Sequence, residues 1–111
     1  MTALTETEVV TALSALAHPH RLQVFRALVV AGPTGLMPSA LATRLDIARN
    51  TLSFHLKELS HAGLVTAEQQ GRHLIYRAAY ERMNALLGFL TENCCAGEAC
   101  AVQASGSCCD D

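Results

Sequence analysis

The side chains with the most distinctive chemistry in this 111-residue chain are five cysteines near its C-terminal end. All five lie within the last 18 residues, at Cys94, Cys95, Cys100, Cys108 and Cys109. Disulfides that hold a fold together would be spread along the chain, so in a cytosolic protein this clustering indicates metal or redox chemistry. Thiolates are soft ligands that disfavour Mg²⁺, Ca²⁺ and Mn²⁺, so the ion expected here is thiophilic.

Two kinds of chemistry fit the vicinal pair Cys94-Cys95 and the nearby Cys100. As(III) and Sb(III) take three thiolates in a pyramidal arrangement, whereas zinc prefers four ligands and would need Cys108 or Cys109 as well. The other interpretation is an exposed tail whose thiols oxidise readily. Because adjacent cysteines close a strained ring poorly, a redox switch would pair Cys94 or Cys95 with Cys100.

A second group of polar side chains follows a helical repeat within residues 48–65. Leu52, Leu56 and Leu59 are spaced to line one side of a helix that Gly63 ends. The other side offers a guanidinium, an amide, a hydroxyl and an ammonium, which can bond base edges and phosphates in a DNA major groove. These side chains are Arg49, Asn50, Ser53 and Lys57, with Phe54 close by and His55 between the two sides. The alternative is an ordinary amphipathic surface helix with a solvated polar face.

Apolar periodicity predicts the elements that would position these groups. Further helices are expected over Thr5–Ala17, Pro19–Val30, Pro38–Leu45 and Tyr80–Asn93. Residues 46–48 form a tight connection between two short helices, which is typical of a helix-turn-helix. Two strands, Leu64–Ala67 and His73–Arg77, flank a turn at Gln69–Arg72, and Arg72 and His73 at its tip can lie along a phosphate backbone. The predicted fold is mainly α with a small β-hairpin, a winged helix-turn-helix in the order α-α-α-α-β-β-α.

The first and last of these helices carry apolar stripes that a single winged helix does not obviously use. We therefore expect them to pack against a second copy of the chain and form a homodimer. The alternative is that both helices close the core of one chain. The expected interface residues are Val9, Leu13, Leu16, Met83, Leu86, Leu87 and Leu90.

Composition and charge narrow the class of protein. Half the residues are apolar, yet no apolar run approaches the ~20 residues that cross a bilayer, and the N-terminus lacks the basic region of a signal peptide. A cytoplasmic protein without a membrane partner is expected. Residues 1–90 hold all eight Lys and Arg with six acids, a net charge of +2, whereas residues 91–111 have a net charge of −4. The mildly basic body supports DNA binding weakly.

Three segments resemble the ArsR/SmtB family of small winged-helix repressors that respond to metals and metalloids. They are residues 16–28, the recognition-helix stretch at 52–59 with Ala62–Val65, and the wing at 71–77. Two family patterns are missing: residues 39–45 have no Cys-x-Cys, and residues 80–92 have no histidine. The remaining cysteines resemble those of an arsenite-responsive subgroup with a vicinal pair and a nearby third cysteine.

The resemblance implies a repressor that binds double-stranded operator DNA with an inverted repeat and is released by As(III) or Sb(III) at Cys94, Cys95 and Cys100. Residues 1–93 would be the DNA-binding and dimerisation domain, and residues 94–111 the tail with the metalloid site. The alternative is a redox sensor or a sensor of another thiophilic metal. An enzyme is not expected, because the chain has no Cys-x-x-Cys, phosphate loop or clustered carboxylates. His18 and His20 are expected to cap a helix or lie at the surface, with metal binding as the alternative. The family pattern places His55 near DNA, and the alternative is a hydrogen bond inside the domain.

Overall fold

The computed structural model describes residues 4–92, which form five α-helices and an antiparallel hairpin in the predicted order. The mainly α winged helix-turn-helix fold is thereby confirmed. The cysteines and Asn93 lie outside the described residues. The elements are α1 (Glu6–Leu16), α2 (Pro19–Ala31), the 3-10 turn η1 (Gly32–Thr34), α3 (Pro38–Leu45), α4 (Arg49–His61), β1 (Val65–Gln70), β2 (His73–Ala78) and α5 (Tyr80–Leu90).

Local sequence explains where the first helices begin. Thr5 and Glu8 form a capping box at the start of α1, with the Glu8 backbone N–H donating to Thr5 Oγ1 at 3.1 Å and the Thr5 N–H donating to Glu8 Oε1 at 2.9 Å. Pro19 opens α2, where its missing N–H costs nothing. His18 caps the same helix, because its Nδ1 accepts a hydrogen bond from the His20 backbone N–H at 3.1 Å.

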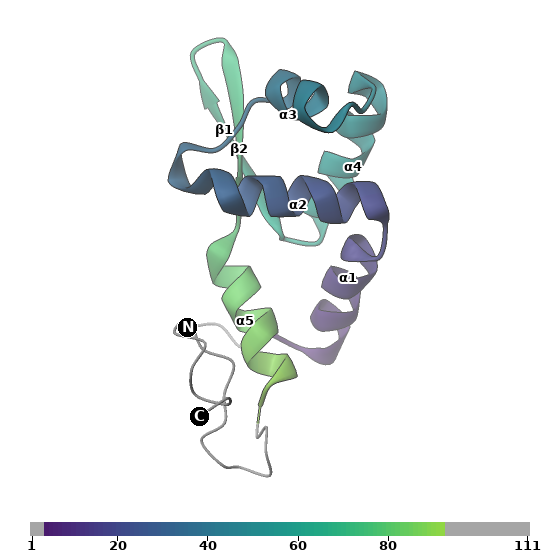
Figure 1. Ribbon diagram of the computed structural model, residues 1–111. Helices are drawn as coiled ribbons and strands as arrows, with labels where there is room; N and C mark the ends of the chain where they lie inside the picture. Colours follow the sequence, from purple (N-terminus) through teal and green to yellow (C-terminus); the bar gives the residue numbers. More distant parts are fainter. Residues whose placement is uncertain (1–3, 93–111) are drawn as a thin grey trace, which may run out of the picture.

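Helix α2 crosses the middle of the molecule and organises the core. Helices α3 and α4 and the hairpin lie toward one end, while α1 and the length of α5 extend toward the other (Figure 1). The largest fully buried side chains come from α2, α3, α4 and the segment that enters β1. They are Val24, Leu28, Leu41, Leu52, Leu56, Leu59 and Leu64, and Ala12 of α1 is also fully buried.

The hairpin is longer than the sequence predicted. Its strands pair from Val65↔Ala78 to Gln70↔His73, so the turn contains only Gly71 and Arg72. Of these two, Gly71 alone has a positive φ, 62°, which is the glycine-first pattern of a two-residue hairpin turn.

A third short piece of chain, absent from the sequence prediction, pairs with the base of the hairpin. Leu36 and Tyr76 exchange two backbone hydrogen bonds of 3.0 and 2.9 Å in an isolated antiparallel bridge. The preceding Gly35 has φ 70°, and a Cβ there would lie 2.6 Å from both Ile75 Cγ2 and the Tyr76 carbonyl oxygen. Only glycine therefore lets the two segments approach this closely.

Two residues expected at a dimer interface belong instead to the core of the single chain. Val9 and Leu86 are 4% and 5% exposed and pack in the main apolar cluster, so their assignment to the interface was wrong. The physical reason is that α1 and α5 each use one part of their apolar surface to pack on the body. For these two positions the alternative of closing the monomer core is the correct one.

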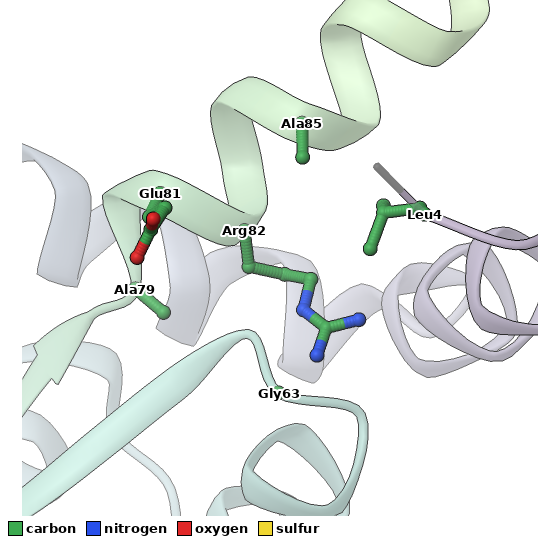
Figure 2. Close-up of a pocket in the computed structure, with 6 residues that line it drawn as sticks. All are labelled: Leu4, Gly63, Ala79, Glu81, Arg82 and Ala85. Atoms are coloured by element: carbon green, nitrogen blue, oxygen red, sulfur yellow. The ribbon is translucent and has the colours of Figure 1, made fainter. Parts of the chain in front are cut away.

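The start of α5 is fixed near the turn that follows α4. The Arg82 side chain extends toward Gly63 and forms one wall of a small cavity with Leu4 and Ala85 (Figure 2). Its NH1 lies 3.9 Å from Glu8 Oε2, which links α5 to α1. Gly63 has φ 78°, and a Cβ at this position would lie 3.0 Å from the Arg82 guanidinium.

Candidate nucleic-acid interface

Helix α4 has the two faces that the sequence predicted. Leu52, Leu56 and Leu59 are buried, and the polar residues assigned to the other side are exposed. These exposed residues are Arg49, Asn50, Ser53, Phe54 and Lys57. Exposure makes them available to a partner, and their contact with DNA stays a prediction.

The link between α3 and α4 presents the beginning of α4 to solvent. Asp46 ends α3 in the left-handed conformation at φ 56°, which its short polar side chain tolerates. Ile47 then turns inward, is 6% exposed, and donates its N–H to the Ala42 carbonyl at 3.1 Å. The first turn of α4 has Arg49 and no acid, so the positive end of the helix dipole adds to a cationic side chain.

The hairpin presents Arg72 and His73 at its tip, where both are exposed. Arg77 fixes the hairpin to the body, with NH1 2.7 Å from Glu68 Oε1 and Nε donating to the Pro33 carbonyl at 2.6 Å. The hydrogen bond from Arg77 lowers the pKa of Glu68, with smaller contributions from Gln70 and the Arg77 charge. The acid nearest the tip is therefore paired within the hairpin, and Arg72 remains as the cation that faces outward.

The predicted DNA contact of His55 is wrong, because its side chain faces inward. His55 is 4% exposed, and Arg21 Nε donates a hydrogen bond to its Nδ1 at 3.3 Å. Burial lowers the pKa of His55, and the nearby His18, Arg21 and His20 lower it further. The Arg21 guanidinium also lies 5.6 Å from the ring centre of Phe54, so it connects His55 to the exposed face of α4.

A cluster of three histidines joins the start of α2 to the middle of α4. The His18 ring centroid lies 4.6 Å from that of His55 and 5.6 Å from that of His20, and the His20 and His55 centroids are 5.5 Å apart. The expectation that His18 caps a helix and that His20 is exposed is confirmed. Sequence spacing gave no sign of the cluster, because His55 reaches it only through the packing of α4 on α2.

The ends of the fold away from the hairpin expose several large apolar side chains. Of the expected interface residues, Leu13, Leu87 and Leu90 are 41%, 45% and 54% exposed, while Leu16 and Met83 are partly buried. Val10, which the sequence analysis missed, is 61% exposed. The sequence offered one signal for it: Val10 is apolar and directly follows Val9 on α1, so a helix that buries Val9 turns Val10 to a different side.

Helix α5 ends far from the hairpin tip. Its last residue is Leu90, and the helix runs away from α3, α4 and the turn of the hairpin (Figure 1). The predicted thiol ligands Cys94, Cys95 and Cys100 follow this end in sequence but lie outside the described residues. Among residues 4–92, none of the helices combines the length and the apolar character needed to cross a bilayer.

Comparisons with known proteins agree with this architecture. A family model described as a helix-turn-helix domain matches residues 16–68. The biofilm growth-associated repressor of Agrobacterium fabrum is 34% identical over 92 residues, which cover 83% of this chain and 76% of that protein. A solved ArsR-like transcriptional regulator from Rhodococcus sp. RHA1 is 30% identical, with a TM-score of 0.70 over 82% of each chain.

A second solved structure is similar over most of the chain. It is the homodimeric winged helix-turn-helix DNA-binding domain of a possible ArsR-family transcriptional regulator from Mycobacterium bovis. It has 26% identity and a TM-score of 0.63, covering 88% of this chain and 96% of that one.

Proposed function

Because this chain belongs to the ArsR-like family of winged helix-turn-helix transcriptional regulators, we propose that it is a homodimeric repressor released from its operator by As(III) or Sb(III). Its relatives are DNA-binding regulators and not enzymes. The observation that carries the proposal is that the side chains suited to DNA and the helix that leads to the cysteines suited to a metalloid lie toward opposite ends of the fold. The exposed polar face of α4 and the tip of the hairpin lie toward one end, and the cysteines follow a helix that runs toward the other.

In this proposal the exposed face of α4 reads the operator sequence. Arg49, Asn50 and Ser53 bond base edges in the major groove, and Lys57 contacts phosphate. Arg72 and His73 at the hairpin tip follow the neighbouring backbone and add affinity without sequence preference. One α4 and one hairpin make a small interface, so useful affinity needs two half-sites arranged as an inverted repeat.

The second copy of the chain packs on the exposed apolar side chains of α1 and α5. Val10, Leu13, Leu87 and Leu90 are each at least 41% exposed, which is costly for four large apolar side chains on two helices of a monomer. The homodimeric domain from Mycobacterium bovis supports this assembly.

The metalloid site is assigned to Cys94, Cys95 and Cys100, which supply the three thiolates that trivalent arsenic prefers. A ligand bound beyond the end of α5 does not cover the face of α4, so it acts by changing how the two copies sit together. The two α4 helices then no longer match the spacing of the half-sites. A typical coupling of ~1–3 kcal/mol would lower DNA affinity roughly 5- to 150-fold.

Gel shift with an operator selected from random DNA tests the proposal. Arsenite should release the parent protein, whereas C94S, C95S and C100S should each bind DNA normally and remain bound in arsenite. The double variant C108S/C109S is the matched control and should respond as the parent does. If the control loses the response, or if C100S keeps it, the three-cysteine site is wrong.

A redox switch on the same cysteines is the second candidate, since Cys94 or Cys95 can form a disulfide with Cys100. Mass spectrometry separates the two functions. The repressor we propose gains the mass of arsenic with loss of the thiol protons, and it is released from DNA by arsenite under reducing conditions. Release by peroxide alone, with a loss of two mass units, would favour the redox switch.

A further inference from the structure

The three histidines between α2 and α4 have the composition of a metal site. One ring nitrogen of each can be chosen so that all three lie within 4.8 Å of one another. His55 is buried, His18 is partly buried and His20 is exposed, so the cluster extends from the core to the surface and is open to solvent on one side. An ion therefore has an entry path, which a metal site requires.

We propose that His18, His20 and His55 bind a divalent transition-metal ion of the zinc class. Imidazole nitrogens are borderline ligands that suit zinc, nickel and copper and do not suit magnesium or calcium. This site is independent of the cysteines and of the arsenite response, because all three ligands come from the folded body of the chain.

The geometry needs only a small closure to meet zinc. With Zn–N bonds of about 2.0–2.1 Å in a tetrahedron, ligand nitrogens lie about 3.3 Å apart. Side-chain rotation of the exposed His20 can supply most of the difference from the 4.8 Å limit, because among residues 4–92 its backbone N–H, and not its ring, forms a hydrogen bond. Three protein ligands leave a fourth position, which water can occupy from the open side.

Arg21 competes with a metal ion for the imidazole of His55. A metal ligand must be a neutral imidazole, because a protonated ring nitrogen has no lone pair to offer the ion. Arg21, however, donates to His55 Nδ1 and places a positive charge beside the cluster. If the ion takes Nδ1, that acceptor is lost, and if it takes Nε2, Nδ1 carries the proton and no longer accepts.

Zinc binding therefore excludes the Arg21–His55 hydrogen bond whichever nitrogen is used. The displaced guanidinium has an alternative position, since Arg21 and Glu58 line the same surface cavity of about 260 Å³. Leaving His55 also changes the contact of Arg21 with Phe54 on the exposed face of α4. Occupancy of the site would thus be transmitted to the face that we assign to DNA.

The experiment uses the full chain with all five cysteines replaced by serine, so that thiolates do not compete for the metal. Zinc alone is titrated against a chromophoric chelator, and the imidazole signals are followed by NMR. One zinc ion should bind each chain and shift the signals of His18, His20 and His55. His20→Ala should weaken zinc binding by about tenfold or more, since even the loss of a supporting contact costs 10–100-fold.

Two further variants make the test specific. Arg21→Met should tighten zinc binding, because it removes both the competing donor and a positive charge while keeping much of the side-chain bulk. His61→Ala is the matched control, an exposed histidine at the end of α4 outside the cluster, and should bind zinc as the parent does. Unchanged affinity in His20→Ala, weaker binding in Arg21→Met, or no zinc binding by the parent would each refute the site.

Discussion

Replacing Gly35 by alanine tests whether the base of the hairpin depends on the close approach described above. Gly32 provides an internal control, because its φ of 72° is nearly the same as the 70° of Gly35. Nothing lies within 4 Å of a Cβ built on Gly32, whereas a Cβ on Gly35 meets Ile75 and the Tyr76 carbonyl at 2.6 Å. The two variants share the backbone strain and differ in the clash.

The expected losses of unfolding free energy follow from these contacts. Both glycines combine their positive φ with an extended ψ, −155° at Gly32 and −174° at Gly35, a region that essentially only glycine adopts. Forcing another residue into it costs about 1–3 kcal/mol, so Gly32→Ala should lose that amount. Gly35→Ala should lose about 2–3 kcal/mol more, because the overpacked Cβ must push away a carbonyl that accepts from Leu36 in the bridge to Tyr76. For a folded part of this size, the difference corresponds to a melting temperature roughly 8 to 24 °C lower.

Urea denaturation followed by circular dichroism measures both variants, at one protein concentration because dimerisation is linked to stability. The same preparations should also differ in DNA affinity, since Gly35→Ala displaces the hairpin that holds Arg72. Equal losses in the two variants would show that the clash is relieved without cost and would refute the argument from close packing.

Three further outcomes are expected. Ser53→Ala should weaken operator binding by about 1–3 kcal/mol and change the preferred sequence, whereas Arg72→Ala should weaken all sequences alike and lower the salt slope by about one; the reverse pattern would exchange their roles. In sedimentation, Leu87→Glu should give monomers, while the control Val30→Glu, 80% exposed on α2, should remain dimeric. The pKa of His55 is lower in the folded chain than its ordinary 6.5, so as the pH falls the unfolded chain binds a proton before the folded chain does. The free energy of unfolding should therefore decrease as the pH drops below 6.5, and His55→Gln should make this decrease smaller.

Periodicity predicted the two faces of α4 because its leucines repeat at helical spacing and its polar side chains fill the rest of the circumference. The same periodicity did not decide the orientation of His55, which lies at the boundary between the faces, and it was the family resemblance that placed this residue near DNA. Whether a boundary residue turns inward depends on the neighbour across the contact, here the start of α2 and Arg21. That neighbour is 34 residues away in sequence, and its approach is set by the packing of helices.

The dimer stripes show a second limit. An apolar repeat on a helix shows that part of its surface is covered, but it does not show by which partner. Val9 and Leu86 are covered by their own chain, while Leu13 and Leu87 on the same helices are left exposed. The bridge between Leu36 and Tyr76 was also beyond prediction, because a single pair of residues carries no repeat.

With the two-residue turn between Gln70 and His73 kept, the hairpin can be lengthened only by adding paired residues to its two strands. Each strand alternates its side chains between two faces, so one additional pair of residues extends the arm by about 3.4 Å but turns Arg72 to the opposite side. Two additional pairs restore the original side and carry Arg72 about 7 Å farther out. Insertions that keep this guanidinium directed to the same side are therefore those that add two residues to each strand, so the tip can be redesigned for a longer binding site without altering the body that supports it.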